Sequence, residues 1–184
     1  AKVLILFGGD SARRTGTLSD VEAALGNRQV QLFGGIEPNP SFETWMEAVT
    51  VAQRDGIDYL LAVGGGSVID GTKFVAAASI FDGDAWDILL KGGTNIHRAL
   101  PFGSVLTLPA TGSEMNKGAV VTRKSLQAKL PFHSEHVFPQ FSVLDPTKSF
   151  TLPPRQVANG VVDAFVHIVE QYLTYPASAP VQDR

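Results

Sequence analysis

Short apolar runs alternate with stretches of helical periodicity through the first 80 residues of the chain. Runs of four or five mainly apolar residues, too short for helices, predict buried strands at 3–7, 30–33 and 59–63. Apolar side chains then recur every three or four positions, which predicts helices over 18–25, 40–49 and 67–80. The order β-α-β-α-β-α is typical of a doubly wound, mainly parallel sheet in an α/β protein.

The third strand leads directly into Gly64, Gly65 and Gly66, and Ser67 is predicted to cap the helix that follows. The first N–H groups of a helix have no intrahelical partner and the helix dipole is positive there. Because glycines let a bulky phosphate approach the backbone, this segment predicts an anion site. A tight strand-to-helix connection without any ligand explains the same pattern.

A second glycine turn, Gly8-Gly9, follows the first predicted strand, and Asn39-Pro40 is predicted to start the second helix. The carboxyl ends of parallel strands meet at one edge of a sheet, where ligands of such folds bind. Both glycine turns are therefore expected at the same edge, which favours nucleotide binding over a purely structural role.

The second half of the chain is richer in loops, with a short helix expected around 86–90. Four further strands are expected, two of them in a hairpin and one returning to the main sheet, at 103–108, 118–122, 127–132 and 141–144. Asp145-Pro146 and Pro153-Pro154 then break the chain, and a helix with regular apolar spacing is expected over 157–172.

Composition narrows the class of protein. The 184 residues suffice for one α/β domain with its own core, and the net charge of −3 offers no basic surface for nucleic acid. No apolar run approaches the roughly 20 residues of a membrane-spanning helix, and the opening run is too short for a signal peptide. The sequence contains no cysteine, so a soluble cytoplasmic protein is expected.

Asp163 and His167 are the strongest candidates for metal ligands. They are four residues apart on a predicted helix and so share one face, where a carboxylate oxygen and an imidazole nitrogen can bind one divalent cation. An exposed ion pair explains the same spacing. His133 and His136 are candidates for further ligands, although their positions at predicted strand ends and turns favour a structural role.

Two lysines are less informative. Lys73 lies too far along its helix to act as a P-loop lysine, which argues against an ATPase. Lys129 lies beside apolar residues, where an ammonium group can approach a cofactor ribose or phosphate, or remain a solvated surface group.

Four ordered motifs together resemble the iron-containing alcohol dehydrogenase family, closest to its NADPH-dependent aldehyde reductase and butanol dehydrogenase branch. They are Gly64-Gly65-Gly66-Ser67-Val68-Ile69-Asp70-Gly71-Thr72-Lys73, Leu108-Pro109-Ala110-Thr111-Gly112-Ser113-Glu114, Leu144-Asp145-Pro146, and Leu152-Pro153-Pro154-Arg155-Gln156 leading to Asp163 and His167. The resemblance implies a Rossmann-like nucleotide-binding domain at 1–153. Residues 154–184 would then begin a helical metal-binding domain whose remainder, like a strand before Ala1, is absent from the chain.

The resemblance also implies cofactor contacts. Gly65, Gly66 and Ser67 would hold the pyrophosphate, with Asp70 near the nicotinamide end. Gly9 stands where NAD-preferring relatives carry an acidic residue, and Ser11 lies near two arginines, so NADP is favoured and NAD remains an alternative. The complete implied set of cofactor-binding residues is Gly8, Gly9, Ser11, Gly65, Gly66, Ser67, Asp70, Thr107, Thr111, Ser113 and Lys129.

By the same resemblance, Asp163 and His167 become two of four ligands for Fe2+ or Zn2+. The implied function is hydride transfer between NADP(H) and a small alcohol or aldehyde, with no nucleic-acid or membrane partner and a homodimer as one oligomeric state. Two alternatives stay open: an isolated, catalytically silent nucleotide-binding fragment, and a relative of glycerol dehydrogenase.

Overall fold

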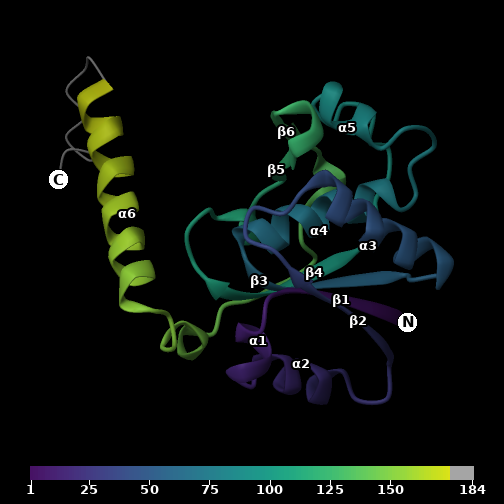
Figure 1. Ribbon diagram of the computed structural model, residues 1–184, viewed down its shortest axis with the longest axis horizontal. Coiled ribbons are helices and arrows are strands. Elements are labelled where there is room, and N and C mark those ends of the chain that lie inside the picture. Colours follow the sequence, from purple (N-terminus) through teal and green to yellow (C-terminus); the bar gives the residue numbers. More distant parts are fainter. Residues whose placement is uncertain (175–184) are drawn as a thin grey trace. The chain divides into compact units, whose positions relative to one another are not determined.

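The computed structural model describes residues 1–174 (Figure 1). Contacts divide the chain into two compact units, Ala1–Ser149 and Phe150–Arg184, which are described separately. The first unit contains the sheet and nearly all of the buried residues, and the second consists, in its described part, mainly of one long helix.

Five parallel strands form the sheet of the first unit, in the order β2-β1-β3-β4-β7. Their bounds are β1 Lys2–Gly8, β2 Gln29–Ile36, β3 Tyr59–Gly65, β4 Phe102–Leu108 and β7 Ser142–Val143. β1 lies between β2 and β3, so the ends of β1 and β3 are adjacent. The predicted parallel, doubly wound, Rossmann-like α/β fold is confirmed.

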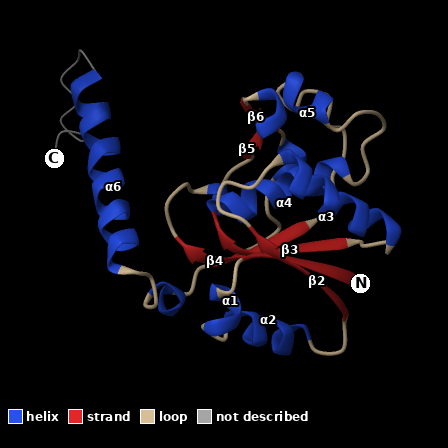
Figure 2. Cartoon of the chain, viewed as in Figure 1, coloured by secondary structure: helices blue, strands red, loops and turns tan. Residues whose placement is uncertain are grey.

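Helices cover both faces of this sheet (Figure 2). α1 (Ser11–Arg14) and α2 (Thr17–Leu25) lie on one face, and α3 (Phe42–Arg54) and α4 (Gly66–Ala78) lie on the other. Alternate strand residues serve the two cores: Leu4 and Leu6 pack towards α3 and α4, whereas Val3 and Ile5 pack towards α2. Burial on both faces explains why these strands read as continuous apolar runs.

α3 and α4 approach each other closely at Gly71. A Cβ atom there would overlap the ring of Trp45, so only glycine fits this contact. The short helix α5 (Trp86–Leu90) was predicted and closes the same core, with the Trp86 ring 5.1 Å from Phe42 at an interplanar angle of 81°. The helix pair therefore fixes α4 rigidly over the centre of the sheet.

The predicted hairpin is present outside the main sheet. β5 (Gly118–Arg123) and β6 (Ala128–His133) pair antiparallel and are joined by the 3₁₀ turn η2 (Lys124–Leu126). Three more 3₁₀ turns lie at η1 (Ser113–Met115), η3 (Glu135–Val137) and η4 (Pro146–Ser149). β7 then returns to the sheet beside β4.

Two predicted helix starts are wrong by a residue or two. α3 is capped by Ser41, whose hydroxyl accepts from Thr44 N at 3.3 Å, and Asn39 instead adopts a positive φ of 52° before it. α4 begins at Gly66 with Gly65 as its N-cap, so Ser67 already lies inside the helix. β3 continues through Gly64 and Gly65, which pair with Leu106 and Leu108 of β4, so the strand passes directly into α4 and leaves no turn for Ser67 to cap.

The second unit contains the helix α6 (Pro154–Thr174), over the range where a helix was predicted. Its apolar side chains are exposed, Phe165 at 65% and Ile168 at 66%. Within residues 1–174, none of the helices combines the length and hydropathy needed to span a membrane.

Candidate cofactor site and candidate metal ligands

The carboxyl edge of the sheet brings both glycine turns together, as predicted. Gly8 ends β1 close to the first turn of α4, because a Cβ atom on Gly8 would lie 3.9 Å from Val68 Cγ2. Gly65 is extended, with φ −90° and ψ −170°, and no side chain caps the helix that it starts. The first amides of α4 therefore point out of this edge without a side-chain acceptor, which suits an anion.

Glycine at position 66 is needed for a close approach of two loops. A Cβ atom there would overlap the side chain of Thr111, which follows β4. Thr111 is exposed and its Oγ1 accepts from Ser113 N at 3.3 Å. The loop after β4 thus folds over the start of α4, and the two predicted cofactor segments lie against each other.

Asp70, one turn into α4, is bound by residues from two other segments. Its Oδ1 accepts from Ser113 Oγ at 2.5 Å, and its Oδ2 accepts from Val120 N at 3.0 Å. Burial raises the pKa of Asp70 above its usual value, although these hydrogen bonds and the charges of Lys73 and Lys129 oppose the shift. Asp70 is therefore a fixed, half-buried acceptor at the mouth of a pocket.

That pocket has a volume of about 480 Å3 and lies between α4, η1 and the hairpin β5–β6. Its wall combines the carboxylate of Asp70 and the hydroxyls of Thr111 and Ser113 with the apolar residues Val120 and Pro131. Small-molecule sites generally combine an apolar wall with a few polar groups, as this pocket does. Such a lining suits a flat ring that forms hydrogen bonds at its edge. His133, predicted to be structural, also lines this pocket.

The sequence predicted no role for Lys73 beyond excluding a P-loop lysine, yet Lys73 is the most unusual group near this pocket. Its side chain is 0% exposed, and its Nζ donates to Asn116 Oδ1 at 2.9 Å and to the carbonyl of Gly118 at 2.7 Å. Burial lowers the pKa of Lys73 to about 8, against the opposing effect of the charges on Asp70 and Glu114. The signal that the sequence offered for this burial was the apolar run from Phe74 to Ala78 that directly follows Lys73.

The remaining predicted cofactor residues are distributed over the ends of β1 and β4, the start of α4 and the hairpin. Gly9 and Ser11 are exposed after β1, and Thr107 is half-buried near the end of β4. Ser67 is exposed in the first turn of α4, whereas Lys129 is exposed on β6, opposite Thr122. Each of these residues belongs to the first unit.

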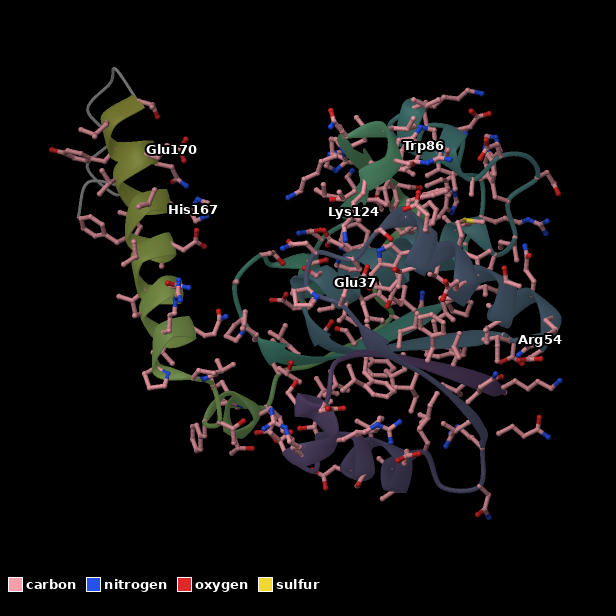
Figure 3. The ribbon with its side chains drawn as sticks, viewed as in Figure 1. Glu37, Arg54, Trp86, Lys124, His167 and Glu170 are labelled. Atoms are coloured by element: carbon pink, nitrogen blue, oxygen red, sulfur yellow. The ribbon has the colours of Figure 1, made fainter. Side chains whose placement is uncertain are left out.

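Asp163 and His167 lie one turn apart on α6, as predicted. His167 Nε2 is 3.6 Å from Asp163 Oδ2, and the side chains of His167 and Asp163 are 65% and 57% exposed respectively. His167 is labelled on α6 in Figure 3. His133 and His136 belong to the first unit, at the end of β6 and in η3. Within residues 1–174 there is no group of three or more His, Cys, Asp or Glu side chains that could hold a metal ion.

Comparison with known proteins yields a consistent set of relatives. The chain is 59% identical over its whole length to NADPH-dependent aldehyde reductase YqhD of Escherichia coli, covering 48% of that protein. It is 46% identical to probable NADH-dependent butanol dehydrogenase 1 of Bacillus subtilis, over 99% of this chain and 47% of the relative. The chain thus spans about half the length of the curated relatives that it matches.

Solved structures give the same result. The crystal structure of E. coli K-12 YqhD matches with a TM-score of 0.92 at 58% identity, over 98% of this chain and 47% of that one. NADH-dependent butanol dehydrogenase A of Thermotoga maritima matches with a TM-score of 0.85 at 41% identity, over 92% and 43% respectively. The family model of iron-containing alcohol dehydrogenase matches residues 1–146, which is most of the chain. The chain belongs to the iron-containing alcohol dehydrogenase family.

Proposed function

We propose that residues 1–153 bind NADP(H), and that the intact protein transfers a hydride between this cofactor and a small alcohol or aldehyde. The observation that carries the proposal is the uncapped first turn of α4, which opens at the carboxyl edge beside the Asp70 pocket. The printed names of the relatives, an aldehyde reductase and butanol dehydrogenases, support this reaction class. A bound nicotinamide would supply the hydride, while the protein binds and orients it.

The cofactor would extend along the carboxyl edge with its pyrophosphate at the first amides of α4. Gly65, Gly66 and Ser67 leave the backbone open there, and the helix dipole favours the negative charge. The adenosine half would lie near Gly8, Gly9 and Ser11, and the nicotinamide end would lie near Asp70. Thr107, Thr111 and Ser113 would line the cofactor cleft, and Lys129 would reach the ribose.

A 2′-phosphate fits the end of β1. Outside its chain neighbours, Gly9 has no heavy atom within 4 Å of where a Cβ would stand, so a phosphate has room at that position, while the exposed Asp10 beside it carries a negative charge. Ser11 and Arg14 are exposed nearby, and the guanidinium of Arg13 lies 5.0 Å from the ring centroid of Phe7. These groups favour NADP, and NAD remains the alternative because the relatives are named for both nucleotides.

Asp163 and His167 would supply two ligands of a divalent metal. A carboxylate and an imidazole on one exposed helix face suit Fe2+ and Zn2+ alike, and their 3.6 Å separation lets both reach one ion. Such an ion supplies Lewis-acid polarisation of a carbonyl oxygen. The role of the two side chains is to hold it, so residues 154–184 would form the start of a metal-binding domain.

A catalytically silent nucleotide-binding chain is the second candidate. It is favoured by the metal-ligand count, because the described residues bring together two ligands and a catalytic site needs three or more. A relative of glycerol dehydrogenase is a third candidate, with a different substrate for the same chemistry. A homodimer and a cytoplasmic location remain predictions from the sequence.

Two measurements on one sample test the proposal. NADPH is titrated into the 184-residue chain by fluorescence, and butyraldehyde reduction is assayed in the same solution. We expect binding without turnover from this chain, and turnover from the intact protein that is lost in His167→Ala and kept in the exposed-loop control His97→Ala. Absence of NADPH binding would contradict the nucleotide site, and undiminished metal-dependent turnover in His167→Ala would contradict the ligand role.

A further inference from the structure

The buried ammonium group of Lys73 forms hydrogen bonds with two residues that line the pocket, Asn116 and Gly118. Lys73 is completely buried, and in the described part of the chain no ion pair joins it to a carboxylate. Its Nζ instead donates hydrogen bonds to two neutral acceptors, Asn116 Oδ1 and the Gly118 carbonyl. A buried cation is costly unless its hydrogen bonds are well made, so these acceptors must be held in place.

Asn116 is the residue that holds this arrangement together. Its Oδ1 accepts from Lys73 Nζ and also from Gly118 N, both at 2.9 Å. Its Nδ2 donates to the Gly112 carbonyl at 2.9 Å. One amide side chain therefore connects the helix α4, the start of η1 and the start of β5.

The segments joined by Asn116 are those that bind Asp70. Ser113, one residue after Gly112, donates to Asp70 Oδ1, and Val120, two residues after Gly118, donates to Asp70 Oδ2. Both carboxylate oxygens thus depend on the backbone on either side of Asn116. If Asn116 is removed, both donors are free to shift, and the polar end of the pocket is no longer fixed.

We infer that Asn116, anchored on Lys73, is a positioning residue for the nicotinamide half of the cofactor. It acts by fixing the two donors that orient Asp70 at the pocket mouth. The inference rests on the proposed NADP(H) site, since it concerns which half of that cofactor the loop serves. The adenosine half, expected near Gly8 and Ser11, is independent of this loop.

The test compares whole and half cofactors. Asn116→Ala removes all three hydrogen bonds, and Asn116→Asp keeps the oxygen acceptors and loses the donor to Gly112. Asn27→Ala, in an exposed turn after α2, is the matched control. We expect Asn116→Ala to bind NADPH at least 10-fold more weakly, with the affinity for adenosine 2′,5′-bisphosphate unchanged. Asn116→Asp should lose less affinity for NADPH than Asn116→Ala.

Hydrogen exchange at the Val120 amide supplies a readout without cofactor. This amide donates to Asp70, so its exchange should accelerate in Asn116→Ala and stay unchanged in Asn27→Ala. Equal loss of affinity for both nucleotides, or an unchanged exchange rate of the Val120 amide, would overturn the inference.

If the wild-type chain binds neither nucleotide, the proposed function fails and the cofactor role of Asn116 fails with it. The exchange data then still decide whether Asn116 positions the loop. If Asn116→Ala does not fold, Asn116→Asp decides by the same two readouts.

Discussion

The carboxyl edge of the sheet and the polar face of α6 carry candidate sites of opposite construction. At the edge, Asp70 is half-buried and Lys73 is buried, and the hydrogen bonds of both come from segments more than 40 residues away. On α6, Asp163 and His167 are exposed and interact mainly with each other. The first site is organised by the fold of its own unit, whereas the second offers ligands that need further groups to complete a shell.

This difference determines what a substitution can do. In the buried site a single change leaves other polar groups without partners, and such a loss costs about 1–3 kcal/mol. An exposed pair contributes little to stability, typically 0–1 kcal/mol, because water and salt screen it. Stability measurements should therefore respond to the first region and barely to the second, whatever each region binds.

Lys73→Met should produce the largest change, in the pH dependence of stability. The pKa of Lys73 is lowered by burial from its usual 10.5 to about 8, so between these values the unfolded chain holds a proton that the folded chain has released. Rising pH therefore favours folding in this window, by roughly 2–3 kcal/mol between pH 7 and pH 10. Lys73→Met should lose this gain in urea unfolding curves.

Lys124→Met is the matched control for that experiment. Lys124 lies exposed on η2 (Figure 3), so its removal takes away a positive charge and leaves the buried one in place. The difference in free energy of unfolding between wild type and Lys124→Met should stay constant from pH 7 to pH 10. The same constancy in Lys73→Met would show that Lys73 is not desolvated.

Gly66→Ala should destabilise the chain by about 2 kcal/mol, because the added methyl group overlaps Thr111 and the loop after β4 must move. The matched substitution on the other region is Gly160→Ala in α6, where nothing lies within 4 Å of the new methyl group. Alanine is the better helix former, so Gly160→Ala should stabilise α6 by about 0.5–1 kcal/mol. Thermal unfolding and helical circular dichroism of the two variants should move in opposite directions.

The outcome for NADPH separates the regions further. Gly66→Ala displaces the backbone at the start of α4. Its NADPH affinity should fall at least 10-fold, which corresponds to a loss of about 1.4 kcal/mol in binding free energy. Gly160→Ala should leave NADPH affinity unchanged. Equal affinities in both variants would contradict a pyrophosphate at the first turn of α4.

The sheet was predictable from the sequence because buried parallel strands are continuous apolar runs between glycines. Val3 to Phe7 and Leu60 to Val63 are buried on both faces, so nothing in them competes with the strand pattern. Helix starts were less predictable, since capping depends on where the chain enters the helix. Ser41 accepts from Thr44 N two residues beyond the predicted cap, and Gly65 remains part of β3.

The role of Lys73 could not be derived from local sequence. Its acceptors are 43 and 45 residues further along the chain, and only the fold brings η1 and β5 against α4. The motif from Gly64 to Lys73 identified the region, but the pattern suggested a lysine too distant for phosphate rather than one buried behind a pocket. Asn116 carries no sequence signal at all, since asparagine in a loop is ordinary turn chemistry.

The smallest effect on stability is expected from Asp163→Asn and His167→Ala. Their 3.6 Å contact is exposed, so each substitution should change the free energy of unfolding by less than about 0.5 kcal/mol. Zn2+ binding to the chain, measured by calorimetry, should nevertheless disappear in both variants, because each removes one of two ligands. Glu170→Gln, three residues beyond His167 on α6 (Figure 3), controls for the loss of a carboxylate and should keep the wild-type Zn2+ affinity. If Glu170→Gln weakens Zn2+ as much as Asp163→Asn does, the ion responds to the charge of α6 rather than to two specific ligands.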